Sequence, residues 1–238
     1  KTVSMPLDVV IMAAGKGTRM KSTLPKVLHR LGGKPLLEHV IDAAAQLNAR
    51  SAVVITGHES KVVQSAINSI AFKAINTTAT AVFDAYKSIN SVLQEPQLGT
   101  GHAVQQTVPV LPDDGMVLVL SGDVPLTQVD TLRALIETSG GDKLALLTID
   151  FDNPAGYGRV VRSNDAGRGA VQAIVEQKDA NDAQKLIKEV YSGIMAVPAK
   201  LLKGWLTRLD NKNAQGEYYL TDIVKFAVAD GLIVVAHK

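Results

Sequence analysis

The chain has 238 residues, of which 46% are hydrophobic and 20% are charged, so it can bury a full core in one large or two small domains. Its 25 Lys and Arg residues nearly balance 23 Asp and Glu residues, and this formal net charge of +2 argues against nucleic acid or a membrane surface as the main partner. The sequence contains no Cys, which excludes disulfides, thiolate metal sites and a cysteine nucleophile. We therefore expect a small-molecule partner.

Short β-branched runs alternate with amphipathic segments along the first 150 residues. The runs are nearly continuous in apolar character, as in strands covered on both faces, and lie at 8–12, 52–56, 116–120 and 144–149. Apolar residues at helical spacing form one stripe at Leu36, Leu37, Val40, Ile41, Ala44 and Leu47, and another at Leu201, Leu202, Trp205 and Leu209. This alternation predicts an α/β fold with a doubly wound, mostly parallel sheet, which binds ligands beyond the carboxyl ends of its strands.

The alternation weakens after about residue 150. A turn-rich break, "DNPAGYG" at 152–158, precedes predicted strands at 158–161 and 170–176 and a predicted helix at 180–189. We interpret this part as a subregion of mixed strands within the same domain. Residues 66–91 are weakly patterned and receive no functional assignment.

The first strand runs directly into a glycine loop, "VVIMAAGKGTRM" at 9–20. Backbone N–H groups at such a strand-to-helix turn bind anions. Arg19 can form two parallel hydrogen bonds to phosphate oxygens, and Lys26 can add a compact positive charge. The loop matches neither the Walker A pattern nor the dinucleotide fingerprint. A turn with solvated cations is the alternative, but Arg19, Pro25 and Lys26 together favour phosphate binding.

A single carboxylate, Asp123, follows the predicted strand 116–120. Mg²⁺ prefers oxygen ligands and is often held by one or two carboxylates together with substrate phosphates, so one Asp is sufficient on the protein side. A plain turn is the alternative reading of Gly122 and Asp123. The position beside the glycine loop favours a magnesium ligand.

The stretch "AAGKGTRMKSTLPKVL" at 13–28 resembles the signature of sugar-nucleotide pyrophosphorylases, which join a nucleoside triphosphate to a sugar 1-phosphate. Three further stretches sharpen the match: "QEPQLGTGHAVQQ" at 94–106, "LSGDVPL" at 120–126 and "NKNAQGEYYLTDIV" at 211–224. Together they resemble, over about residues 7–237, the uridyltransferase domains of the bacterial bifunctional N-acetylglucosamine-1-phosphate uridyltransferase/glucosamine-1-phosphate acetyltransferase family.

The resemblance implies a Rossmann-like nucleotidyltransferase fold in one domain, 7–238. About 1–150 would be its nucleotide-binding part and about 151–238 its sugar-binding part. The implied substrates are UTP and N-acetylglucosamine 1-phosphate, with Mg²⁺ as cofactor. The implied products are pyrophosphate and UDP-N-acetylglucosamine, a precursor for the cell wall and lipopolysaccharide.

The resemblance also implies a set of site residues. Arg19, Lys26 and Asp123 would be catalytic, and Asp123 would bind the metal. The implied substrate contacts are Met12, Ala13, Ala14, Gly15, Lys26, Gln94, Gly99, Thr100, Ser121, Gly122, Asp123, Gly158, Glu176 and Tyr191.

Three of these contacts have alternatives or depart from the family. Gln94 can match the imide edge of uracil, and Glu176 can accept from sugar hydroxyls, but each could instead belong to a polar loop or turn. Tyr191 stands where the better-known members carry Asn. Its contact to the sugar or ribose is therefore left open.

The resemblance leads to expectations about the end of the chain. In the family, a second Mg²⁺ ligand, an Asn, lies beyond the strand that resembles 232–236, and a left-handed β-helix acetyltransferase domain follows. No six-residue repeat typical of a β-helix occurs here. We therefore expect a fragment that lacks acetyltransferase activity, binds Mg²⁺ weakly and is a monomer or weak dimer, whereas full-length members are trimers.

Two other functions remain open at this point. One is a pyrophosphorylase with a different sugar or base, and the other is a sugar-nucleotide-binding module without turnover. The sequence has no apolar run long enough to span a bilayer and no apolar core of a signal peptide at its start, so we expect a cytoplasmic location.

Overall fold

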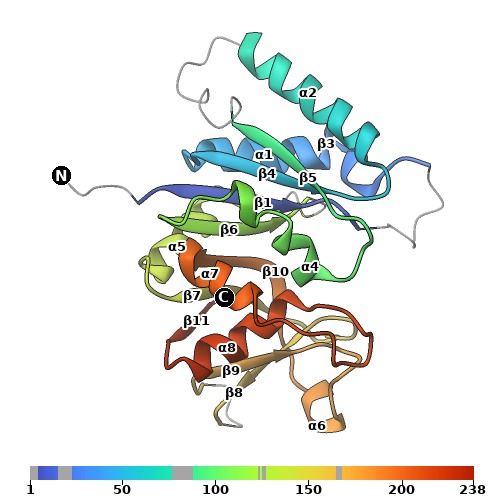
Figure 1. Ribbon diagram of the computed structural model, residues 1–238. Coiled ribbons are helices and arrows are strands. Elements are labelled where there is room, and N and C mark those ends of the chain that lie inside the picture. The colour runs from blue at the N-terminus through green and yellow to red at the C-terminus, as the bar shows by residue number, and fades with distance from the viewer. Residues whose placement is uncertain (1–4, 16–22, 77–87, 123, 125–126, 165–167) are drawn as a thin grey trace.

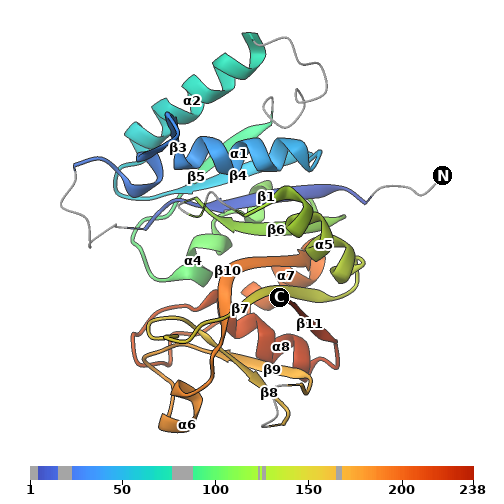
Figure 2. The ribbon, with the colours of Figure 1, turned by 180° about the vertical axis from the view of Figure 1, so that it is seen from behind.

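One large mixed sheet with helices on both faces forms the molecule (Figures 1 and 2). This computed structural model describes residues 5–15, 23–76, 88–122, 124, 127–164 and 168–238. The strands run in the order β11-β7-β10-β6-β1-β4-β5, and β8 pairs with both β10 and β9. They are β1 (Leu7–Met12), β4 (Ser51–Thr56), β5 (Ile89–Leu93), β6 (Met116–Ser121), β7 (Leu144–Asp150), β8 (Arg159–Arg162), β9 (Val171–Val175), β10 (Glu189–Pro198) and β11 (Val234–His237).

The helices divide between the two faces of the sheet. One face carries α1 (Leu36–Gln46), α2 (Ser60–Asn76) and α5 (Val129–Ser139), and the other carries α4 (Thr100–Gln105), α7 (Ala199–Leu206) and α8 (Ile223–Ala229). The smaller elements are α6 (Asp182–Lys185), η1 (Lys26–Leu28), η2 (Val108–Val110), η3 (Leu220–Asp222) and the pair of β2 (Arg30–Leu31) with β3 (Lys34–Pro35).

The apolar strands contribute side chains to two hydrophobic cores, one on each face of the sheet. In β1, Val9 and Ile11 enter the core under α1, while Val10 enters the core under α4 and α7. Successive side chains of a strand point to opposite faces, so a strand covered on both sides must be apolar at every position. This explains the continuous apolar runs in the sequence and confirms the predicted doubly wound arrangement.

The sheet is parallel in its first half and mixed in its second. β1 runs parallel to β4 and β6, β4 to β5, and β7 to β11. The long strand β10 lies between β6 and β7, antiparallel to both, and also pairs with β8, which is antiparallel to β9. The prediction of a mostly parallel sheet with a mixed-strand subregion is confirmed, and the sequence reasoning missed β10 and β5.

The predicted helix at 180–189 is wrong in its length. A capping box formed by Asn181 and Gln184 starts α6, but the helix ends at Lys185. Leu186 is 81% exposed, so no apolar face continues the helix. Glu189 instead enters β10, where it pairs with Asp150 of β7 and forms an ion pair with Arg162 of β8. Glu189, which the local pattern assigns to the end of the helix, is therefore the first residue of β10.

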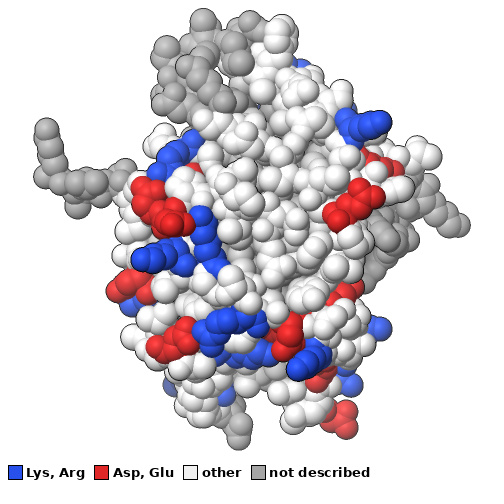
Figure 3. Space-filling model, in the orientation of Figure 1, with Lys and Arg blue, Asp and Glu red and all other residues white. Residues whose placement is uncertain are grey.

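Charged side chains of both signs are mixed on the face shown in Figure 3. They gather along its left, lower and right margins, and a broad area without charged side chains lies across the middle of the view. Within the described ranges, no helix is both long and apolar enough to cross a membrane.

Candidate functional site

The carboxyl ends of three neighbouring strands meet where the chain order of the sheet reverses around β1. Met12 pairs with Ile55 of β4 on one side and with Ser121 of β6 on the other. The N–H of Ala13 donates to Ile55 O at 2.9 Å, and the N–H of Gly122 donates to Met12 O at 2.9 Å. The sheet therefore places the start of the glycine loop, at Met12 and Ala13, beside Ser121 and Gly122, at the kind of crevice where α/β sheets bind ligands.

The segment that carries Lys26 packs against the same edge. A Cβ added to Gly122 would lie 3.1 Å from Val27 Cγ1 and 3.2 Å from Met12 O, so a larger residue at 122 would push η1 away. Lys26 is the first residue of η1 and is exposed. Arg19 and Asp123, the other two predicted catalytic residues, lie outside the described residues.

Gly15 is free of the constraints that usually select glycine. An added Cβ there would have no described atom within 4 Å, and its φ lies outside the left-handed range. Ala13 and Ala14 just before it are buried, with 7% and 8% of their surface exposed. An exposed glycine with space around it, directly after two small buried residues, leaves room for a ligand to approach the backbone.

The loop 94–99 lies across the end of β4. The N–H of Gln94 donates to Thr56 O at 2.8 Å, and the Gln94 amide Nε2 donates to Gly99 O at 3.0 Å and contacts His102 Nδ1 at 3.0 Å. Because an amide N–H₂ only donates, His102 Nδ1 is the acceptor in this contact. Gln97, from the same loop, donates to Ala14 O and so joins this loop to the glycine loop.

Gly99 and Thr100 bind the segment 217–222, which we call the strap. Tyr218 donates its N–H to Leu98 O at 2.8 Å and accepts from the N–H of Gly101 at 2.7 Å. Thr100 Oγ1 accepts from the N–H of Leu220 at 2.9 Å. The strap is thereby fixed to the N-terminal end of α4.

The other end of the strap reaches the predicted sugar contacts. Thr221 donates its hydroxyl to Glu176 Oε1 at 2.9 Å, and a Cβ added to Gly158 would lie 3.5 Å from the same oxygen. Tyr191 donates its N–H to Gly158 O at 2.9 Å. The structure thus brings Gly158, Glu176 and Tyr191 together. The strap connects this group to the other group of predicted contacts, Gln94, Gly99 and Thr100.

Two polar groups in this cluster are held in unusual environments. Burial raises the pKa of the Glu176 carboxyl, and the charge of Asp222 raises it further, although the hydrogen bond from Thr221 acts in the opposite sense. Burial also raises the pKa of the Tyr191 phenol. Its hydroxyl is buried and has no hydrogen-bond partner in the part of the chain that the structure describes. Unsatisfied buried polar groups are uncommon and often mark a place for a ligand.

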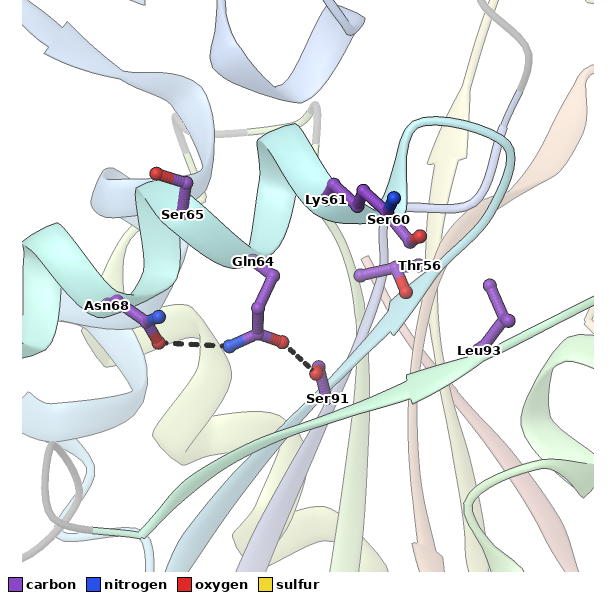
Figure 4. Close-up of a pocket in the computed structure, with 8 residues that line it drawn as sticks. All are labelled: Thr56, Ser60, Lys61, Gln64, Ser65, Asn68, Ser91 and Leu93. Atoms are coloured by element: carbon purple, nitrogen blue, oxygen red, sulfur yellow. Dashed lines mark hydrogen bonds between the residues drawn. The ribbon is translucent and has the colours of Figure 1, made fainter.

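A cavity of about 480 Å³ lies elsewhere, between α2 and β5 (Figure 4). It is lined by Thr56, Ser60, Lys61, Gln64, Ser65, Asn68, Ser91 and Leu93. Ser91 donates to Gln64 Oε1, and Gln64 Nε2 donates to Asn68 Oδ1 at 3.0 Å. The two side-chain amides that line the cavity are therefore hydrogen-bonded to each other. None of the predicted site residues lines it.

Sequence reasoning missed two residues that organise the site. Gln97 joins two loops, and Thr221 orients Glu176. Both lie in the stretches that carry the family resemblance. Their roles depend on partners that are distant in the sequence, 83 positions away for Gln97 and 45 positions away for Thr221, and only the structure shows these contacts. Among the described residues, no group of three or more His, Cys, Asp or Glu side chains could hold a metal ion.

Comparison with known proteins gives relatives of high identity. The chain is 68% identical over 232 residues to the bifunctional protein GlmU of Albidiferax ferrireducens, covering 98% of this chain and 47% of that protein. It is 64% identical to the bifunctional protein GlmU of Polaromonas naphthalenivorans, covering 98% and 47%. The chain therefore spans about half the length of the curated relatives it matches.

Solved structures share the fold. A UDP-glucose pyrophosphorylase complexed with UDP-glucose superposes with a TM-score of 0.76 at 18% identity, covering 98% of this chain and 90% of that one. The apo form of a UDP-glucose pyrophosphorylase superposes with a TM-score of 0.74 at 16% identity.

The shared fold and the family match define the chain as a nucleotidyltransferase-like α/β protein. Residues 9–192 match the family described as MobA-like NTP transferase domain. The chain belongs to this family.

A first test concerns the contact between Gly99 and the strap. Gly99 has φ +117°, and an added Cβ would lie 2.6 Å from Tyr218 O and 2.8 Å from Tyr218 N. We expect Gly99→Ala to lose about 1–3 kcal/mol of unfolding free energy from backbone strain, with a further loss from the clash, measured by urea unfolding. In Gly204→Ala, the matched control in α7, the added Cβ meets no atom within 4 Å. Equal stability of the two variants would contradict the contact.

A second test uses the raised pKa of Glu176. As pH rises above the ordinary carboxyl pKa, the unfolded chain loses this proton before the folded chain does, so folding stability falls until the raised pKa is passed. Glu176→Gln removes this penalty, and we expect its Tm to exceed that of the wild type more at about pH 7 than at about pH 4. Glu137→Gln, an exposed position on α5, controls for the chemical change. The same Tm difference at both pH values would contradict this account.

Proposed function

We propose that the chain transfers the uridylyl group of UTP to N-acetylglucosamine 1-phosphate, releasing pyrophosphate and forming UDP-N-acetylglucosamine. The observation that carries the proposal is the strap, which joins the predicted nucleotide contacts at Thr100 to the predicted sugar contact at Glu176 through adjacent residues, Leu220 and Thr221. The relatives at 68% and 64% identity and the fold shared with a UDP-glucose pyrophosphorylase support it.

The reaction needs positioning and charge neutralisation rather than a covalent intermediate. A phosphate oxygen of the sugar phosphate attacks the α-phosphorus of UTP, the new P–O bond forms as the bond to the leaving pyrophosphate breaks, and the two oxygens lie in line. Backbone N–H groups of the glycine loop and Lys26 would hold the phosphates, and Arg19 would stabilise the pyrophosphate. No described atom lies within 4 Å of a Cβ added at Gly15, which supports this placement.

The metal expected for this reaction is Mg²⁺, which neutralises phosphate charge when it is bound. Asp123 is the residue proposed to hold it, and Gly122, directly before it, is fixed to Met12 beside the glycine loop. One carboxylate with substrate phosphates suits the ion, which retains several waters and needs no cluster of protein ligands.

The base would bind at the 94–100 loop and the sugar at Glu176, two places that the strap joins. Gln94 is proposed to read uracil through its carbonyl oxygen, because both hydrogen bonds of its side chain use the amide nitrogen. Glu176 is proposed to accept from sugar hydroxyls, and Gly158 to bond the N-acetyl group. The two domain parts, the weak oligomerisation and the cytoplasmic location stay predictions.

A pyrophosphate-release assay tests the proposal directly. The chain is incubated with UTP or dTTP and with N-acetylglucosamine 1-phosphate, glucose 1-phosphate or mannose 1-phosphate, with Mg²⁺ present. The fastest release is expected from UTP with N-acetylglucosamine 1-phosphate. A different preferred pair would support another pyrophosphorylase specificity, and binding without release would support a module without turnover.

Asp123→Asn tests the metal role in the same assay. A neutral amide is a poorer ligand for a hard cation, so we expect kcat to fall at least about tenfold at ordinary Mg²⁺ and to recover in part at high Mg²⁺. The melting temperature should be unchanged. Full activity in this variant would show that Asp123 does not bind the metal and is only a turn residue.

Tyr191→Phe separates a ligand contact from a packing role. If the phenol hydroxyl bonds the substrate, the KM for the sugar phosphate should rise by about 2- to 13-fold, the equivalent of about 0.5–1.5 kcal/mol for one hydrogen bond. The stability of the free chain should not fall, because this hydroxyl has no partner among the described residues. An unchanged KM would assign Tyr191 to packing alone.

A further inference from the structure

Arg159 is a buried cation whose charge the proposed mechanism does not use. It is the first residue of β8, its side chain is among the largest that are fully buried, and the residue is 2% exposed. None of the ion pairs between described residues includes it. A buried charge without a carboxylate partner is costly, so a simple stabilising role is a poor explanation for it.

The Arg159 guanidinium instead bonds two backbone carbonyls. Nη1 donates to Tyr157 O, and Nη2 donates to Lys185 O at the end of α6 at 3.4 Å. Nε is buried and makes no hydrogen bond to any residue that the structure describes. The side chain therefore joins the turn before β8 to the end of α6.

The bond to Tyr157 O fixes the orientation of one peptide group. The bond between Tyr157 and Gly158 is not among the cis peptide bonds, so its C=O and N–H point in opposite directions. Because the carbonyl points toward Arg159, the N–H of Gly158 points away from it. That N–H makes no hydrogen bond to another described residue, whereas Gly158 O accepts from the Tyr191 N–H.

Gly158 lies against the sugar end of the site. A Cβ added there would be 2.8 Å from Ile174 Cγ2 and 3.5 Å from Glu176 Oε1, so only glycine leaves this peptide next to the Glu176 carboxyl. An N–H donor without a partner beside a carboxylate suits a ligand group that presents a carbonyl oxygen next to hydroxyls. An acetamido group on a sugar ring is such a group.

We propose that Arg159 is a positioning residue that orients the Gly158 N–H toward the acetamido carbonyl of the sugar phosphate, and so determines selectivity for acetylated substrates. This rests on the proposed function. Arg159 itself touches no substrate. Its planar guanidinium donates to Tyr157 O and Lys185 O at the same time, and a shorter or apolar side chain cannot do so.

The test compares selectivity rather than activity alone. Wild type and Arg159→Met are assayed with UTP and either N-acetylglucosamine 1-phosphate or glucosamine 1-phosphate. We expect kcat/KM for the acetylated substrate to fall about tenfold, mainly through KM, as for the loss of one well-placed hydrogen bond. The values for glucosamine 1-phosphate and the KM for UTP should be unchanged, so the ratio between the two sugars falls by the same factor.

Arg162→Met is the matched control. Arg162 lies in the same strand, but its guanidinium bonds Glu189 and Gly169 O rather than the 152–158 turn. Its sugar selectivity should equal that of the wild type even if its melting temperature falls. Should Arg159→Met not fold, Arg159→Gln replaces it, because the shorter amide does not reach both carbonyls.

The outcomes distinguish the two proposals. Unchanged selectivity in a folded, active Arg159 variant would overturn the role of Arg159 and leave the proposed function standing. An equal loss with both sugars would also overturn it, because a general structural defect predicts that result. A wild-type chain that neither binds nor turns over N-acetylglucosamine 1-phosphate would overturn both proposals.

Discussion

The close approach of the 98–101 loop to the strap is the constraint on which the rest of the site depends. Tyr218 forms backbone hydrogen bonds with Leu98 and Gly101 on either side of Gly99, whose α-carbon faces the Tyr218 backbone with no space for a side chain. Backbones that pack this closely have few alternative arrangements, since a shift of either segment breaks these hydrogen bonds. The contact joins the loop after β5 to a segment more than 100 positions later in the chain.

That contact gives the two ends of the site a shared support. Leu220 is bonded to Thr100 and its neighbour Thr221 to Glu176, so a movement of the strap would displace both residues together. Asp179 adds a second attachment near Glu176, because it accepts from the Tyr219 hydroxyl of the strap and from the N–H of Ala214. A transfer reaction between two bound substrates gains from such a rigid connection, because rates depend steeply on the relative placement of the reacting atoms.

The predicted sugar contacts include polar groups whose hydrogen bonds a ligand would complete. The Glu176 carboxyl is partly removed from water. The Tyr191 hydroxyl and the Gly158 N–H have no hydrogen-bond partner among the described residues. Each of these costs folding free energy, and a ligand that supplies hydrogen bonds would recover part of it. The buried Arg159 belongs with them, since its charge is also uncompensated by any carboxylate in the described part of the chain.

The sequence by itself determined the sheet class, the buried strands around β1 and the helices α1 and α7, because these depend on local periodicity and on the need to cover both faces of a strand. It also indicated the chemistry of the strand-end loops, since glycines, cations and a carboxylate were read directly from 13–28 and 120–126. The tertiary structure alone decided that 189–198 is a central strand and that the helix predicted at 180–189 ends at Lys185, because the partners of β10 lie at distant positions in β6, β7 and β8. It likewise decided the contacts of Gln97 and Thr221, since their hydrogen bonds span 83 and 45 positions and form only when distant segments of the chain pack together.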